Sequence, residues 1–241
     1  MQFNLTDDPN FSRALELLEG QGLIPARVSE ENRGSYLVWI GTTEIPAKLS
    51  GRLRFDAPGT GDFPAVGDWV GVEPVDQNSF ALIHRVLPRK TVIRRKAAGR
   101  RMDCQVLASN VDLVFIMQSL DGDFNPRRLE RTCVLAAESG AETVVVIGKT
   151  DLADQAGIEA ATAEACRAAA GARIVPFSAK TGQGMETIQA LVANGVTACF
   201  LGSSGVGKST FSTCSQAKSS WKRARSARAT PGAAMSPRGG R

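Results

Sequence analysis

The stretch VTACFLGSSGVGKST, residues 196–210, is a strand-like apolar run that leads directly into a glycine-rich loop. Its pattern GxxxxGK[ST] is typical of a phosphate-binding loop, in which glycines let backbone N–H groups wrap a phosphate. Lys208 is predicted to reach the outer phosphates, and the Ser209 hydroxyl is predicted to bind Mg²⁺, so these two are the candidate catalytic residues. The predicted phosphate-contacting residues are Gly202, Ser203, Ser204, Gly205, Val206, Gly207, Lys208, Ser209 and Thr210.

Strand and helix patterns alternate upstream of this loop. The runs VDLVFIMQS and ETVVVIGKTDL are almost continuously apolar, as expected of parallel strands that are buried on both faces. This alternation predicts a doubly wound α/β domain that binds its ligand at the carboxyl ends of the strands. The predicted strands are residues 111–119, 142–152, 172–180 and 196–202, and the predicted helices are residues 126–140, 158–171 and 185–195.

Two short motifs indicate which base the nucleotide carries. Residues 148–151, GKTD, end a predicted strand and resemble the guanine-specificity motif Asn-Lys-x-Asp. The Asp151 carboxylate can accept two hydrogen bonds from the ring N–H and amine of guanine, which adenine does not offer. Gly148 stands where the motif usually has asparagine, and the missing amide is expected to reduce guanine affinity. With the Ser-Ala-Lys loop that ends the next strand, the predicted base-contacting residues are Gly148, Lys149, Thr150, Asp151, Ser178, Ala179 and Lys180.

The amino-terminal half has a different pattern of secondary-structure signals. Short strand-like runs separated by Gly, Asn, Asp or Pro occupy residues 23–101, after a helical pattern within residues 1–22, and they predict a small barrel or sandwich. The only histidine, His84, is interpreted as structural. A basic cluster beside the barrel predicts phosphate contacts with RNA, with a solvated linker as the alternative. Its members are Arg85, Arg89, Lys90, Arg94, Arg95, Lys96, Arg100 and Arg101.

The order of the motifs is unusual. The guanine motif and Ser-Ala-Lys precede the phosphate loop, whereas ordinary GTPases have the phosphate loop first, so the domain is predicted to be circularly permuted. Together with RVLPRKTVIRRK, ASNVDLVFIMQSL and FNPRRLER, these features resemble the ribosome small-subunit-dependent GTPase (RsgA/YjeQ) family over residues 20–211. The resemblance implies a fold that is all-β plus α/β, with an OB-fold barrel followed by a partial, permuted P-loop GTPase domain.

The resemblance implies a function. It implies GTP or GDP with Mg²⁺ as cofactor, the small ribosomal subunit and its rRNA as partners, and slow GTP hydrolysis that the subunit stimulates during its late maturation. It also implies a carboxyl-terminal zinc domain, whose Cys and His ligands are not found in this chain. The predicted division is a helical extension at 1–22, the barrel at 23–101, the GTPase domain at 102–211 and a disordered tail at 212–241.

Residues 212–241 do not continue the family pattern. They contain seven Lys and Arg residues, no acidic residue and hardly any aliphatic one, where a phosphate-loop helix is expected. The threonine-bearing switch and the Asp-x-x-Gly strand end that follow the loop in a working GTPase are not found there. We interpret the segment as an out-of-frame product of a single-base deletion near the codons for residues 211 and 212, with a natural RNA-binding tail as the alternative. Hydrolysis by this chain is expected to be impaired.

Composition limits the class of protein. The tail accounts for the net charge of +5, because the first 211 residues contain 22 basic residues against 24 acidic ones. No run of about 18 apolar residues and no signal-peptide pattern is present, and the five dispersed cysteines read as reduced thiols. A cytoplasmic monomer without membrane contact is expected. The alternative function is a non-catalytic OB-fold RNA-binding protein with a vestigial nucleotide domain.

Overall fold

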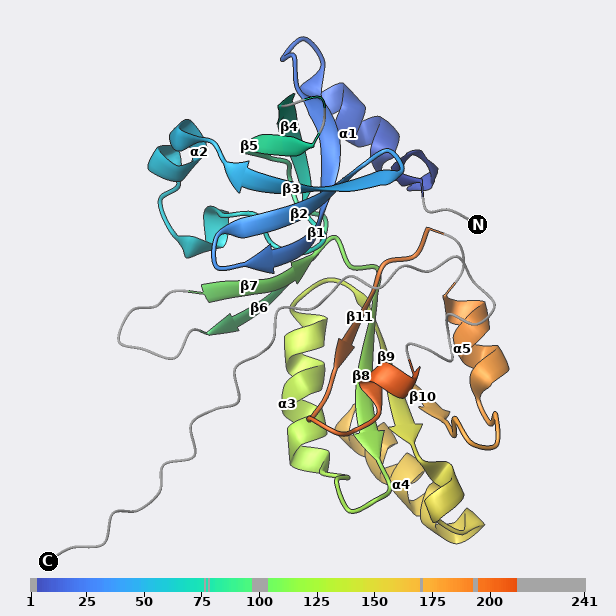
Figure 1. The fold of residues 1–241 in the computed structure, drawn as a ribbon. Helices are drawn as coiled ribbons and strands as arrows, with labels where there is room; N and C mark the ends of the chain where they lie inside the picture. Colours follow the sequence, from blue (N-terminus) through green and yellow to red (C-terminus); the bar gives the residue numbers. More distant parts are fainter. Residues whose placement is uncertain are drawn as a thin grey trace, which may run out of the picture.

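The computed structural model of the chain describes residues 4–75, 77, 79–96, 104–169, 171–192 and 195–211. Its elements form a β-barrel and an α/β unit that are joined by a two-stranded ribbon (Figure 1). Among the described residues, none of the helices has the length and apolar composition needed to cross a bilayer. The predictions for residues 212–241 lie outside the described residues.

The barrel is closed by five short strands in the order β1-β2-β3-β5-β4, which confirms the predicted barrel. Its interior holds small and branched side chains from every strand, such as Val38, Val70 and Ile83. A 3₁₀ turn, η1 (Leu5–Asp7), and helix α1 (Phe11–Leu18) pack their apolar side chains against Trp69 on the outside. The strands are β1 (Ile24–Asn32), β2 (Ser35–Ile40), β3 (Thr43–Leu49), β4 (Trp69–Val75) and β5 (Phe80–Val86).

The connection between β3 and β4 is more ordered than its Gly and Pro content indicates. Helix α2 (Gly51–Asp56) begins there because the Ser50 hydroxyl accepts a hydrogen bond from Leu53 N at 3.2 Å. A 3₁₀ turn, η2 (Thr60–Asp62), follows it. Two short helical segments therefore lie within this connection.

A two-stranded ribbon links the barrel to the α/β unit. Strands β6 (Val92–Lys96) and β7 (Cys104–Ser109) pair antiparallel, although the sequence shows only a basic segment there. The predicted domain boundary after residue 101 falls in the connection between these paired strands. The ribbon therefore carries the chain from one unit to the other.

The α/β unit is a parallel four-stranded sheet in the order β10-β9-β8-β11. Every residue of β8 (Leu113–Ser119) is buried, as its apolar run predicts. The other strands are β9 (Glu142–Gly148), β10 (Arg173–Pro176) and β11 (Ala198–Leu201). Because β11 is last in the chain but pairs with β8, the strand that carries the phosphate loop lies beside the first strand of the unit.

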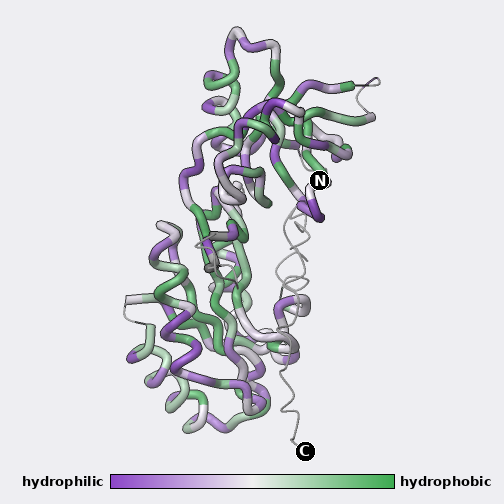
Figure 2. The backbone as a smooth tube through the Cα atoms, turned by 90° about the vertical axis from the view of Figure 1, so that its left-hand side faces the viewer, coloured by the Kyte–Doolittle hydropathy of each residue, from purple (hydrophilic) through white to green (hydrophobic). Residues whose placement is uncertain are grey.

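Helices cover both faces of this sheet. Helices α3 (Pro126–Ala137) and α4 (Gln155–Ala168) pack on the face that includes Val114 and Ile116. Helix α5 (Met185–Leu191) packs on the opposite face with Phe115 and Met117. In Figure 2 the hydrophobic colour is concentrated on the strands between these helices. This three-layer arrangement confirms the doubly wound prediction.

Phe211 belongs to the packed core. It is 1% exposed, and its ring centroid lies 4.9 Å from that of Phe177, 5.3 Å from Phe115 and 5.5 Å from Phe200. The chain therefore packs as part of the domain up to Phe211, the last described residue.

Buried polar contacts hold the barrel against the ribbon and against the α/β unit. Asp68 is fully buried and accepts hydrogen bonds from Arg89 Nε at 2.8 Å and from Ser109 Oγ at 2.5 Å. Ser109 N also donates to Val66 O at 2.9 Å. On the same side, Arg27 Nη2 donates to Thr197 Oγ1 at 2.7 Å, just before β11. The amino ends of the sheet therefore face the barrel.

We expect Gly67→Ala to destabilise this joint by at least about 2 kcal/mol. Gly67 has φ +92°, and a Cβ there would lie 2.1 Å from Ser109 O, which is backbone. Chemical denaturation of the full chain measures the loss. Gly34→Ala is the matched control, because Gly34 also has a positive φ but an added Cβ meets no atom within 4 Å. Equal losses for both variants would contradict a role for close packing at Gly67.

Candidate functional site

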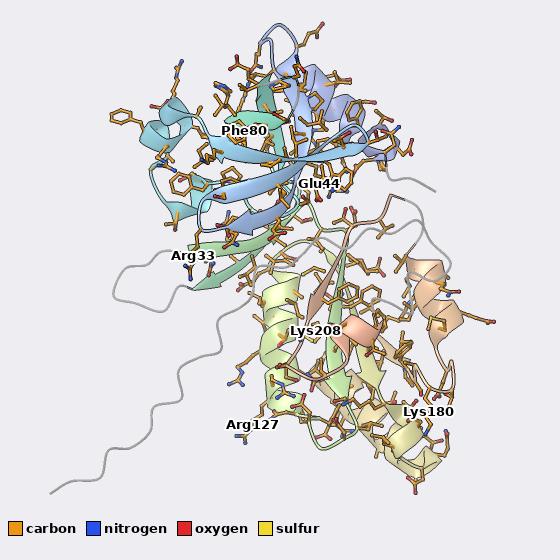
Figure 3. All side chains as sticks on the ribbon, in the orientation of Figure 1. Arg33, Glu44, Phe80, Arg127, Lys180 and Lys208 are labelled. Atoms are coloured by element: carbon orange, nitrogen blue, oxygen red, sulfur yellow. The ribbon has the colours of Figure 1, made fainter. Side chains whose placement is uncertain are left out.

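The carboxyl ends of the four parallel strands form the candidate nucleotide site. Successive strands β8, β9 and β10 extend the sheet in one direction, and the chain then returns to place β11 on the other side of β8. The reversal between β8 and β11 is the switch point at which open α/β sheets bind ligands. The loops after Ser119 and Leu201 meet there. Figure 3 shows Lys180 and Lys208 in this unit, away from Arg33 and Glu44 in the barrel.

The phosphate loop follows β11 with the backbone torsions that such a loop requires. Gly205 and Gly207 have φ values of +80° and +103°, and a Cβ added at either would meet no atom within 4 Å. Left-handed glycines of this kind turn successive N–H groups toward one anion. Lys208 Nζ donates to Gly202 O at 2.9 Å and to Ser203 O at 2.5 Å. The loop therefore has a concave form with its lysine folded against it.

Two opposing effects act on the pKa of Lys208. Burial lowers the pKa of Lys208, whereas the nearby Asp123 carboxylate raises it. The Asp123 carboxylate also accepts a hydrogen bond from Ser203 Oγ and forms an ion pair with Arg128, whose Nη2 lies 3.0 Å from Asp123 Oδ2. The loop after β8 thereby connects the phosphate loop to helix α3.

The predicted guanine motif and the Ser-Ala-Lys loop come together at the next two strand ends. Ser178 Oγ donates to Asp151 Oδ1 at 2.6 Å. This bond is the main cause of the lowered pKa of Asp151, so the carboxylate stays charged at neutral pH. Ser178 is fully buried, and its Oγ accepts hydrogen bonds from Lys180 N and Thr181 N, both at 3.2 Å. The serine therefore orients Asp151 and shapes the loop that contains Ala179.

Gln183 adds a contact that the sequence motifs do not reveal. The Thr150 hydroxyl donates to Gln183 Oε1 at 2.6 Å, and Gln183 O accepts a hydrogen bond from Ser178 N at 3.1 Å. Gln183 follows the Ser-Ala-Lys loop and thus fastens it to the guanine motif. The two motifs form one hydrogen-bonded unit.

Lys149 links the guanine motif to the phosphate loop. It has left-handed backbone torsions, φ 60° and ψ 38°, and its Nζ contacts the Asp121 carboxylate and lies 3.4 Å from Gly205 O. Asp121 also accepts a hydrogen bond from Ser119 Oγ at 2.7 Å. Together the bonds from Lys149 and Ser119 lower the pKa of Asp121 to about 2.

A cavity of about 350 Å³ lies between the loop after β8 and the phosphate loop. It is open and polar, and Asp121 and Asp123 supply its charged groups. Neither carboxylate belongs to a motif that the sequence identified, yet both directly follow a fully buried strand. Polar residues at the carboxyl end of such a strand are the signal that could have found them. The lining residues are Ser119, Asp121, Gly122, Asp123, Ser204, Gly205 and Val206.

The structure corrects the interpretation of part of the basic cluster. Arg89 is buried against Asp68, with its guanidinium also donating to Gly61 O at 2.7 Å and Phe63 O at 2.8 Å, so it is not available to RNA. Lys90 Nζ lies 3.5 Å from Asp112 Oδ1, and Arg85 donates to Gln21 Oε1 at 3.0 Å. Arg94 is exposed. The side chains of Arg95, Lys96, Arg100 and Arg101 lie outside the described residues.

The predicted metal ligand lies at the start of the helix that follows the loop. Ser209 and Thr210 directly follow Lys208, which is the arrangement of a loop that binds nucleotide phosphates and Mg²⁺ together. The described part of the chain has no group of three His, Cys, Asp or Glu side chains suited to a metal ion. A nucleotide-linked Mg²⁺ fits this donor set, since phosphate oxygens and water supply its remaining ligands.

Comparison with known sequences gives a consistent result. The model of the RsgA GTPase family matches residues 86–226, a range that runs past Phe211. The small ribosomal subunit biogenesis GTPase RsgA of Opitutus terrae is 39% identical over 212 residues, which cover 85% of this chain and 57% of that protein. RsgA 2 of Lactiplantibacillus plantarum is 39% identical over 197 residues, which cover 81% of this chain and 54% of that protein. The chain thus spans little more than half the length of these curated relatives.

Solved structures agree on the fold. YjeQ from Thermotoga maritima matches with a TM-score of 0.63 and 26% identity, covering 80% of this chain and 65% of that one. YloQ, described as a circularly permuted GTPase, matches with a TM-score of 0.57 and 21% identity, covering 80% of this chain and 64% of that one. These matches confirm the predicted permuted GTPase fold with its OB-like barrel.

Proposed function

Since the chain belongs to the RsgA GTPase family, whose model matches more than half of its length, we propose that it binds GTP and assists late maturation of the small ribosomal subunit. We assign slow GTP hydrolysis that the subunit stimulates to the family function, and we expect residues 1–241 by themselves to hydrolyse GTP poorly. We propose further that it acts as a cytoplasmic monomer without membrane contact, and that the barrel supplies contacts to rRNA.

One observation carries the proposal. Asp151, held by Ser178 at 2.6 Å, and the loop that contains Lys208 lie at strand ends of the same sheet, with Lys149 between them. A guanine nucleotide needs these two binding regions at once, a carboxylate for the base and a concave amide loop for the phosphates. An ATPase or kinase would not need the paired Asp151 and Ser178.

The residues have separate roles in this proposal. Asp151 accepts the two guanine hydrogen bonds, Lys149 lays its aliphatic stem along the base, and the Ser-Ala-Lys loop contacts the guanine carbonyl through its backbone. Lys208 neutralises charge on the outer phosphates. Ser209 holds Mg²⁺, which offsets the negative charge that develops on the phosphates during transfer. A zinc domain, which the family implies, has no ligand set in the described residues.

We expect the full chain to bind GDP and GTP at least about tenfold more tightly than ADP and ATP, because only guanine satisfies both oxygens of Asp151. Titration calorimetry with the four nucleotides and Mg²⁺ measures this preference. Single-turnover hydrolysis with and without purified small subunits then measures activity. The 241-residue chain is expected to show little stimulated turnover, because the switch motifs are not found after its phosphate loop.

The two readouts separate the proposal from its rivals. A preference for ATP would contradict it and favour an ATPase or kinase. RNA binding by a chain that binds no guanine nucleotide would also contradict it and favour the non-catalytic RNA-binding protein. Clear subunit-stimulated hydrolysis would support the family function and contradict the expected impairment of this chain.

A further inference from the structure

The Lys149 ammonium group is the point at which three loops of the nucleotide site meet. Lys149 itself belongs to the loop after β9, Asp121 to the loop after β8, and Gly205 to the phosphate loop. Its left-handed backbone, with φ 60°, is uncommon for a residue other than glycine and is held by its surroundings. A single side chain therefore links the base-binding and phosphate-binding halves of the site.

A second hydrogen bond orients the Asp121 carboxylate toward Lys149. Asp121 Oδ1 accepts a hydrogen bond from Ser119 Oγ at 2.7 Å, which leaves Oδ2 for Lys149. The side chains of Lys149 and Asp121 are each about one-third exposed, so the pair is partly shielded from water.

Gly148 leaves the first position of the guanine motif without a side chain. A Cβ added there would lie 3.4 Å from Gln118 O and 3.9 Å from Val206 O, so a side chain would point toward the backbone of the phosphate loop. The φ of Gly148 is not left-handed, and the added Cβ makes only ordinary contacts. An asparagine amide at this position could donate to a neighbouring carbonyl, and Gly148 has no such group.

We propose that Asp121 is a positioning residue that holds the guanine-recognition loop against the phosphate loop through Lys149, in place of the side chain that Gly148 lacks. This inference rests on the proposed function, because it concerns the same guanine site. Asp121 acts on the nucleotide only through Lys149, whose stem is the part that faces the base. Loss of Asp121 therefore affects guanine selectivity more than phosphate binding.

A double-mutant cycle on the full chain tests the inference. GDP and ADP affinities are measured for the wild type, Asp121→Ala, Gly148→Asn and the double variant, with exposed Glu130→Gln on α3 as control. We expect Asp121→Ala to weaken GDP binding about tenfold and ADP binding less than about twofold. In the Gly148→Asn background, the same change is expected to lower GDP affinity less than about threefold, because the new amide can hydrogen-bond a neighbouring carbonyl.

Each other outcome counts against the inference. Unchanged GDP affinity in Asp121→Ala overturns it, and so does an equal loss for GDP and ADP. A full tenfold loss in the Gly148→Asn background also overturns it, because Asp121 would then act independently of position 148. A wild-type chain that does not prefer GDP defeats the proposed function instead. Thermal unfolding without nucleotide verifies that the variants are folded.

Discussion

Lys208→Ala is expected to lower the affinity of the chain for GDP and GTP at least about a hundredfold. The change removes the only lysine that lies within the phosphate loop, and a hydrogen bond to a charged group contributes about 1.5–3 kcal/mol. The desolvation that lowers the pKa of Lys208 also makes its interaction with phosphate stronger than in open water. Equilibrium titration with GDP and with GTP measures the loss.

The structure separates this effect from unfolding. Among the described residues, Lys208 donates hydrogen bonds to two carbonyl oxygens of its own loop, those of Gly202 and Ser203, in addition to its charge interaction with Asp123. Denaturant stability of the variant should therefore stay close to that of the wild type. Lys48→Ala, an exposed lysine on the barrel, is the matched control. If both variants bind GDP equally well, Lys208 does not contact the phosphates.

The parts of the site that the sequence predicts are those in which a motif and a strand end coincide. The phosphate loop, Asp151 and Ser178 each follow a strand that the sequence predicts from an apolar run, and a parallel sheet brings the carboxyl ends of its strands to one edge. The bond between Asp151 and Ser178 joins residues 27 positions apart, but it follows from β9 and β10 being neighbours.

The remaining contacts depend on which strands lie next to each other. Asp123 reaches Ser203 across 80 positions only because β11 returns to pair with β8. The local sequence of residues 120–124, LDGDF, contains no pattern that predicts this pairing. The sequence does not reveal the contacts of Asp68 with Arg89 and Ser109 for the same reason. Arg89 lies in a basic segment, and a sequence pattern of that kind favours an exposed position. Short local motifs therefore identify the nucleotide-binding residues, whereas the contacts that position these residues depend on which strands pair.

The guanine assignment itself is tested most directly at Asp151. Asp151→Asn is expected to weaken GDP binding at least about a hundredfold and to create binding of xanthosine diphosphate (XDP). Guanine offers two donors to the two carboxylate oxygens, whereas xanthine has a carbonyl in place of the amine. An asparagine side chain presents one acceptor and one donor, which match the N–H and the carbonyl of xanthine. Competition titrations with GDP, XDP and ADP measure the exchange.

The contact with Ser178 makes this substitution informative. Ser178 Oγ donates to Asp151 Oδ1, and the asparagine carbonyl oxygen can accept the same bond. That bond would hold the amide nitrogen at the former Oδ2 position, where it can donate to the xanthine carbonyl. Because the phosphate loop is untouched, ADP binding should not change. A variant that loses GDP without gaining XDP would show that residue 151 supports the loop rather than reading the base. A gain of XDP binding matched to the loss of GDP binding cannot arise from a merely structural role, so it would establish Asp151 as the residue that selects guanine.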